Sequence, residues 1–149
     1  MKHINFKILL VFTFCVMNLI AVAQPAGRTI ELIGFVMDSF TDYGLEKAQE
    51  ALENAAQDKV VVLFTDGEPN HQNGFDYKVA TDAVNTAKTL KQDNTTIYTV
   101  GVFKNPSNDI NLYMSSVSSN YPEATAARDG RSWRVTNGGD VAGTHYINA

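Results

Sequence analysis

The loop after the most hydrophobic internal stretch of the chain carries the residues best suited to chemistry. Asp66 comes directly after the run KVVVLFT at residues 59–65, and Gly67 and Pro69 favour a sharp turn behind it. A carboxylate in this place suits a hard cation such as Mg²⁺, which prefers oxygen ligands and keeps several waters. The same carboxylate would also serve as a turn cap, so position alone leaves both interpretations open.

Other polar residues are weaker candidates for a metal site. His71 and His145 each lack a second ligand at metal-binding spacing, and Glu68 is expected to bond the loop or face water. A metal-assisted hydrolase that uses Asp66 as ligand or nucleophile is a less favoured alternative. The sequence has no DxD phosphatase pattern, no GxSxG elbow and no glycine-rich phosphate loop.

The elements that must position Asp66 alternate between strands and helices. Unbroken apolar runs predict buried strands at residues 30–37, 59–65 and 95–103. Helical spacing of apolar residues predicts helices at residues 41–59 and 75–94. A third helix is expected after residue 107, with an apolar side made of Ile110, Leu112, Tyr113, Met114 and Val117. Residues 121–149 are ambiguous, with short strands expected at 132–136 and 146–149.

This alternation predicts an α/β fold, doubly wound, with a mostly parallel sheet and flanking helices. Thr41 or Asp42 is expected to cap the first helix, and Ser107 or Asn108 the third. In such sheets ligands bind beyond the carboxyl ends of the strands. That rule points to the loop at Asp66.

Residues 1–23 have the features of a removable export signal. Lys2 and Lys7 precede an apolar run that ends in Ala21-Val22-Ala23, the small-residue pattern of a cleavage site. We therefore expect residues 24–149 to form the folded unit of a secreted or cell-surface protein. Only a retained signal would reach a membrane, since no second apolar run approaches spanning length.

Length, charge and cysteine content narrow the function further. A chain of 149 residues predicts one domain, and 44% hydrophobic residues argue against disorder. The net charge of −4, with no acid in residues 1–23, excludes generic nucleic-acid binding, which needs clustered positive charge. The single cysteine, Cys15, lies inside the predicted signal, so the folded unit has no disulfide, thiolate zinc site or cysteine nucleophile.

Several segments, in their order and spacing, resemble the von Willebrand factor A domain. KVVVLFTDGEPN is similar to the strand and the third metal motif of that family. TDYGLEKAQEALENA is similar to the threonine loop and the helix that carry the second metal motif. TTIYTVGVF resembles the strand after the next helix, and INLYMSSVSSNYPEA the following helix of bacterial surface members. The resemblance runs from about residue 41 to residue 124.

The resemblance implies a metal-ion-dependent adhesion site that holds Mg²⁺ or Mn²⁺. Family ligands come from a DxSxS motif, a threonine matched here by Thr41, and an aspartate matched by Asp66. An acidic residue of a protein partner takes the open metal position, and the family binds proteins rather than transforming substrates. We therefore expect an adhesion or protein-binding module and no enzyme.

The sequence departs from the family where the first metal motif should be. It contains no DxSxS motif, although Asp38 and Ser39 end an apolar run as that motif would and are candidate substitute ligands. Phe40 stands at the position of the first serine, so we expect a degenerate site with weak cation binding. About a third of the domain is expected to be lacking, including its central first strand. Either residues 30–37 replace that strand, or the chain is a truncated remnant that needs another chain; truncation is favoured.

Overall fold

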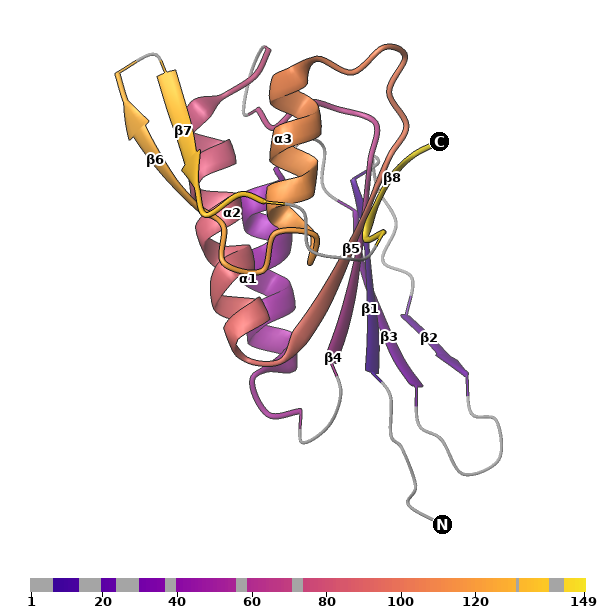
Figure 1. The fold of residues 1–149 in the computed structure, drawn as a ribbon. Helices are drawn as coiled ribbons and strands as arrows, with labels where there is room; N and C mark the ends of the chain where they lie inside the picture. Colours follow the sequence, from indigo (N-terminus) through magenta and orange to yellow (C-terminus); the bar gives the residue numbers. More distant parts are fainter. Residues whose placement is uncertain are drawn as a thin grey trace.

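Eleven regular elements follow one another along the part of the chain that the structure describes (Figure 1). The computed structural model describes residues 40–55, 59–70, 74–130, 132–139 and 144–149, together with the backbone of three earlier strands. The elements are β1 (Lys7–Thr13), β2 (Ile20–Ala23), β3 (Ile30–Val36), α1 (Thr41–Leu52), β4 (Lys59–Thr65), α2 (Tyr77–Gln92), β5 (Thr95–Gly101), α3 (Asn108–Val117), β6 (Thr125–Asp129), β7 (Ser132–Thr136) and β8 (Tyr146–Asn148).

Six strands form one mostly parallel sheet in the order β2-β3-β1-β4-β5-β8. Only β2 runs antiparallel, beside β3 at the edge. β4 pairs with β1 on one side and with β5 on the other over its whole length, from Lys59 to Thr65. The predicted α/β fold with a mostly parallel sheet is therefore confirmed.

The middle of this sheet is filled by β1. Residues 7–13 lie between β3 and β4, parallel to both, so β3 takes the neighbouring position and does not replace the central strand. β1 and β2 both belong to the segment for which the sequence predicts an export signal. Cleavage after Ala23 stays a prediction, and it would remove both strands from the chain.

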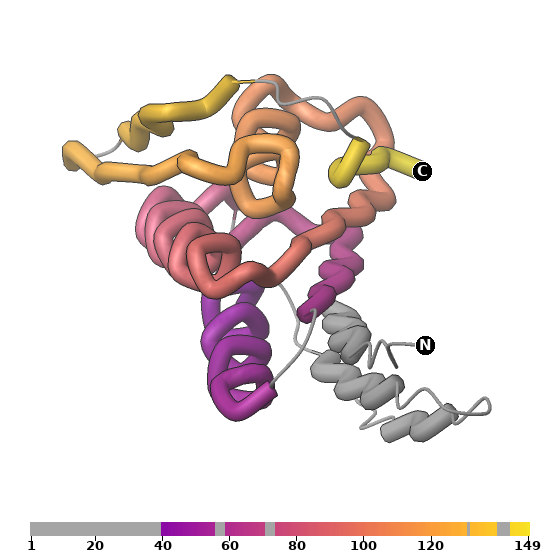
Figure 2. The backbone as a smooth tube through the Cα atoms, turned by 60° about the horizontal axis from the view of Figure 1, so that its bottom comes forward, coloured from indigo at the N-terminus to yellow at the C-terminus, as the bar shows by residue number. Residues whose placement is uncertain are grey.

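The three helices lie on the same face of the sheet in both views (Figures 1 and 2). This arrangement explains the alternating burial along β5, where Ile97 and Thr99 are fully buried while Tyr98 between them is 38% exposed. The core lies between the sheet and the helices. Its largest fully buried side chains are Tyr113, Leu45, Leu52, Leu63, Leu90, Ile97, Met114, Val61, Val79 and Val84.

Of the two predicted helix caps, one is confirmed: Ser107 caps α3. The cap of α2 was not predicted; it is Asp76, which accepts from the amides of Lys78 (2.7 Å) and Val79 (3.3 Å). The prediction that Thr41 or Asp42 caps α1 is wrong. Phe40 holds that position without a side-chain cap, and both predicted residues are buried in the first turn.

A two-stranded hairpin, β6–β7, packs beside α2 (Figure 1). Its turn contains Gly130 at φ 59°, a left-handed conformation that suits glycine. Trp133 of β7 lies 5.4 Å from the ring of Phe75 and 6.3 Å from that of Tyr113, so the hairpin extends the core. Among the described residues, no helix is long and apolar enough to cross a membrane.

Candidate functional site

Asp66 lies where the sequence placed it, one residue beyond the carboxyl end of β4. Thr65 shapes the turn, because its hydroxyl donates to the carbonyl of Gly67 (3.0 Å) and accepts from the amide of Gly67 (3.2 Å). The carbonyl of Thr65 accepts from the amide of Val102 (2.9 Å), which ties the turn to the end of β5. With its neighbour buried and bonded in this way, Asp66 is left exposed.

Asp66 opens onto a cavity of about 310 Å³, which we call the strand-end cleft. One wall is formed by Asp66 and Glu68, and the other by the segment that joins β5 to α3. The lining residues of this second wall are Val102, Phe103, Lys104, Asn105, Pro106, Ser107 and Ile110. The cleft therefore lies at the carboxyl edge of the sheet, where α/β proteins bind ligands.

Asn148 of β8 holds the second wall in place. Its side-chain oxygen accepts from the amide of Phe103 (3.0 Å), and its side-chain nitrogen donates to the carbonyl of Phe103 (3.1 Å). Asn105 has a φ of 61°, a left-handed conformation that asparagine tolerates better than most residues. The Ser107 hydroxyl then accepts from the amide of Ile110 (3.2 Å) and starts α3. A short irregular segment is thus fixed at both ends.

The two walls of the strand-end cleft carry opposite charge. Asp66 and Glu68 present carboxylates, while Lys104 and the positive end of the α3 dipole face the same space. Carboxylate and hydroxyl oxygens are the ligands that Mg²⁺ prefers. The cleft therefore has one wall suited to a hard cation and one suited to an anionic group.

Thr41, the second candidate ligand, is buried inside the core. It is the first residue of α1, it is fully buried, and its hydroxyl shares a short hydrogen bond with the hydroxyl of Tyr113 on α3. Burial raises the pKa of Tyr113, so this phenol stays protonated throughout the physiological range. The oxygen of Thr41 is thus engaged by the protein and is not offered to the solvent.

The described residues supply only part of a magnesium site. Asp66 fits a hard cation by its chemistry and exposure, whereas Thr41 is occupied; Asp38 and Ser39 lie outside the described residues. No group of three or more His, Cys, Asp or Glu side chains able to hold a metal occurs in the described part of the chain. A cation at Asp66 would therefore depend on water for much of its coordination.

Sequence reasoning missed the second wall of the cleft and the partner of Thr41. The rule that ligands bind at strand ends applies to β5 as well as β4, and it would have selected residues 102–107. Tyr113 was assigned to the apolar side of α3, which is correct for its ring. Its hydroxyl gave no signal, because the bond to Thr41 joins residues 72 positions apart.

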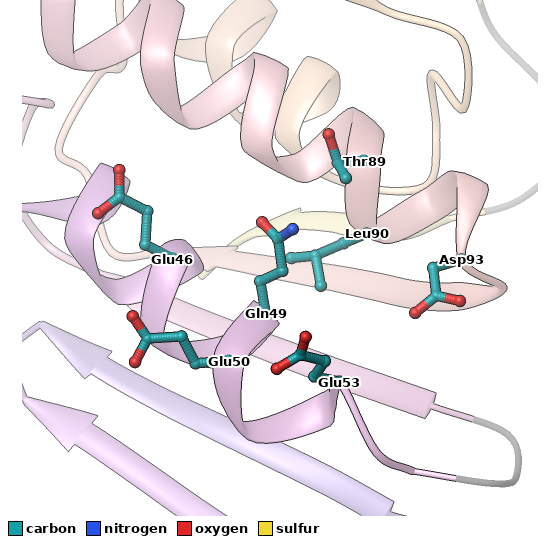
Figure 3. Close-up of a pocket in the computed structure, with 7 residues that line it drawn as sticks. All are labelled: Glu46, Gln49, Glu50, Glu53, Thr89, Leu90 and Asp93. Atoms are coloured by element: carbon teal, nitrogen blue, oxygen red, sulfur yellow. The ribbon is translucent and has the colours of Figure 1, made fainter.

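A larger cavity, of about 460 Å³, lies between α1 and α2 (Figure 3), and we call it the α1–α2 hollow. It is lined by Glu46, Gln49, Glu50, Glu53, Thr89, Leu90 and Asp93. Glu50 pairs with Lys47 (2.6 Å), and Asp93 with the buried ammonium of Lys59. Because Lys59 begins β4, this hollow lies toward the amino edge of the sheet, away from Asp66.

Comparison with known protein families agrees with the sequence resemblance. The model of the von Willebrand factor type A domain matches residues 36–136 of the chain, which includes α1, β4, α2, β5, α3 and the β6–β7 hairpin. Separate comparisons with curated proteins and with solved structures each returned no match. The matched segment starts at the last residue of β3 and spans well over half of the sequence. The chain therefore belongs to the von Willebrand factor type A domain family.

Proposed function

We propose that this chain is a protein-binding module that uses the strand-end cleft to hold an acidic side chain of a protein partner, with Mg²⁺ or Mn²⁺ at Asp66. Von Willebrand factor A domains generally mediate protein–protein interaction and adhesion, and they commonly bind these two metals. The metal site is degenerate: Asp66 is its main protein ligand, Asp38 and Ser39 are subsidiary candidates, and Thr41 would contribute only if its hydroxyl left Tyr113. Water completes the coordination, which makes cation binding weak.

One observation supports this proposal above the others. Asp66 is an exposed carboxylate at the carboxyl edge of the sheet, and it faces a wall that carries Lys104 and the start of α3. A cation held by Asp66 neutralises the acidic wall. A partner carboxylate is then attracted by the cation, by Lys104 and by the helix dipole together.

The metal part of the proposal is tested by titrating the full chain with Mn²⁺ in a calorimeter. Asp66→Ala removes one charged contact, which is typically worth 1.5–3 kcal/mol, so we expect binding to weaken by about tenfold or more. Glu53→Ala is the matched control, because it removes an exposed carboxylate from the α1–α2 hollow. Equal Mn²⁺ affinity in Asp66→Ala and the unchanged chain would refute the assignment.

The partner part is tested by selecting displayed peptides on the full chain in Mg²⁺. The selected peptides are expected to share an Asp or Glu, and their binding is expected to disappear in EDTA and in Asp66→Ala. Selected peptides that lack acidic residues, or that bind equally well in EDTA, would contradict this mode of recognition.

We further propose that the protein is exported and acts outside the cytoplasm, as the charged and apolar pattern of residues 1–23 indicates. Intact-mass measurement on protein recovered from the producing cells tests this. Loss of residues 1–23 supports export with cleavage after Ala23. Full-length protein found only in the cytoplasm contradicts it.

A further inference from the structure

The β6–β7 hairpin, which lies beside α2 (Figure 1), is closed along one edge by a side chain. The side-chain nitrogen of Asn85 on α2 donates to the carbonyl of Ala126 on β6 (3.0 Å), and its side-chain oxygen accepts from the amide of Ala126 (3.0 Å). Both backbone groups of Ala126 therefore point away from β7. One amide side chain thus takes the place that a neighbouring strand would take beside β6.

This orientation fixes which backbone groups point outward from β7. Hydrogen-bonded and non-hydrogen-bonded residue pairs alternate in an antiparallel ladder, and Ala126 with Val135 is a non-hydrogen-bonded pair. The pair of Arg128 and Trp133, two residues further along, is of the same kind. The amides and carbonyls of Trp133 and Val135 therefore face the outer edge of β7. Within the described part of the chain, no further strand pairs with that edge.

The inner face of the hairpin fixes β7 in place. The ring of Trp133 packs 5.4 Å from that of Phe75 and 6.3 Å from that of Tyr113. The hydroxyls of Thr125 and Thr136 bond each other across the two strands (2.6 Å). Because β7 is already ordered, a strand that adds to its edge has only its own freedom to lose, which favours binding.

The hairpin is basic, although the chain as a whole is acidic. The net charge of the sequence is −4, yet three of its four arginines fall within residues 125–136, against one acid. Arg134 is exposed and lies between Trp133 and Val135, so its side chain stands beside any strand added to β7. A carboxylate directly opposite Arg134 stabilises the pairing, whereas a second cation there opposes it.

We propose that the outer edge of β7 binds an extended acidic segment of a partner protein by strand addition, with a carboxylate of that segment opposite Arg134. This surface is separate from the strand-end cleft and needs no metal ion. A second copy of the chain fits the edge less well. Two-fold pairing of β7 strands through Trp133 and Val135 places the two copies of Arg134 directly opposite each other, where like charges are destabilising.

The charge preference is tested with two labelled peptides, VTVEVTV and VTVKVTV, whose binding to the full chain is followed by fluorescence anisotropy in low salt with EDTA. In each peptide the charged residue and the threonines share one face of the strand, and the valines share the other. The acidic peptide is expected to bind about tenfold more tightly than the basic one. Arg134→Glu is expected to reverse this preference. Arg128→Glu is the matched control, since it makes the same charge change on β6, and it is expected to keep the preference.

The backbone contribution is tested by Val135→Pro. Because the amide of Val135 points out of the hairpin, proline removes a donor to the added strand and no bond to β6. This variant is expected to keep its circular dichroism spectrum and to lose peptide binding. Amide hydrogen exchange checks the same point without a substitution. The amide of Val135 is expected to exchange faster than that of Arg134 in the free chain, and to slow when VTVEVTV is bound.

Equal binding of the two peptides, an unchanged preference in Arg134→Glu, or full binding to Val135→Pro would each overturn the proposal. If Val135→Pro does not fold, the charge reversal and the exchange of the Val135 amide decide it. Binding that requires Mg²⁺ or is lost in Asp66→Ala would place the peptide in the strand-end cleft and also overturn it. Dimerisation of the full chain that Val135→Pro abolishes would assign the edge to a second copy instead.

Discussion

The strand-end cleft and the α1–α2 hollow lie toward opposite edges of the same sheet and differ in charge. The cleft mixes two carboxylates with Lys104 and the N-terminus of α3. The larger hollow is lined by four acidic residues: Glu46 and Glu50 within α1, and Glu53 and Asp93 at the C-caps of α1 and α2 (Figure 3). This difference shows that the direction in which the helices run, more than the size of a cavity, decides which edge of the sheet can bind an anionic group.

Helix direction explains this contrast. The helices run antiparallel to the strands they connect, so helix N-termini gather with the carboxyl ends of the strands and helix C-termini gather at the other edge. The helix dipole is positive at the first edge and negative at the second. Acidic side chains in the hollow add to the negative end, and Lys47 and Lys59 offset them only in part.

The largest expected effect comes from removing residues 1–23, on which both edges depend. The deletion removes β1 and β2, and β3 and β4 lose the central strand that pairs with both. Unpaired backbone groups in the middle of a sheet are strongly destabilising. We expect residues 24–149 alone, the form that cleavage after Ala23 would leave, to show no cooperative thermal transition by circular dichroism unless another chain supplies the missing strands, whereas residues 1–149 melt cooperatively. Equal transitions would show that β1 is dispensable.

An intermediate effect on stability is expected at Lys91. This residue of α2, which borders the α1–α2 hollow, is bonded to the segment that follows α3, the helix at the strand-end cleft. Its ammonium donates to the carbonyls of Ser116 (2.7 Å), Ser118 (3.2 Å) and Tyr121 (2.8 Å) beyond α3. Burial lowers the pKa of Lys91 from 10.5 to about 8. Above pH 8 the unfolded chain therefore binds more protons at this site than the folded chain, and the free energy of unfolding rises with pH.

Between pH 8 and 9.5 the free energy of unfolding is expected to rise by about 2 kcal/mol because of Lys91. Above that range it is opposed by Tyr113 and Tyr146, whose pKa values are raised by burial. Urea unfolding across the window is expected to show the slope in the unchanged chain and in Lys88→Met, and to lose it in Lys91→Met. The same slope in Lys91→Met would assign the effect to another group.

The smallest expected effect tests the charge contrast itself. Glu53 caps the C-terminus of α1 and Asp109 lies in the first turn of α3. Glu53→Lys should raise the free energy of unfolding by about 0.3–0.5 kcal/mol, and Asp109→Lys should lower it by a similar amount. Both changes should shrink in 1 M salt. Urea unfolding that gives the same sign for both variants would contradict the assigned dipoles.

The sequence predicted the elements whose hydrophobic pattern is local. β4 was expected at residues 59–65 and lies at Lys59–Thr65, because an unbroken β-branched run fits a central parallel strand. The pattern was less accurate on α3, where Leu112 is 37% exposed although its spacing placed it on the apolar side. β6 was not predicted, because TAARD has no apolar period and forms only as the partner of β7.

The candidate site was predicted in part for the same reason. Asp66 follows a local pattern and was placed correctly at the strand end. The engagement of Thr41 depends on Tyr113, and the second wall of the cleft depends on Asn148, which reaches Phe103 across 45 positions. Contacts between residues so far apart leave no periodicity in the sequence.

Because β1 lies in the middle of the sheet, the stability of the sheet depends on whether the peptide bond after Ala23 is intact. While it is intact, β1 and β2 are tethered to β3, and their effective concentration at the sheet is on the order of millimolar whatever the protein concentration. Once that bond is cut, the same strands become a separate peptide that must bind from solution. Folding then changes from a unimolecular to a bimolecular process, and the stability of the sheet depends on dilution.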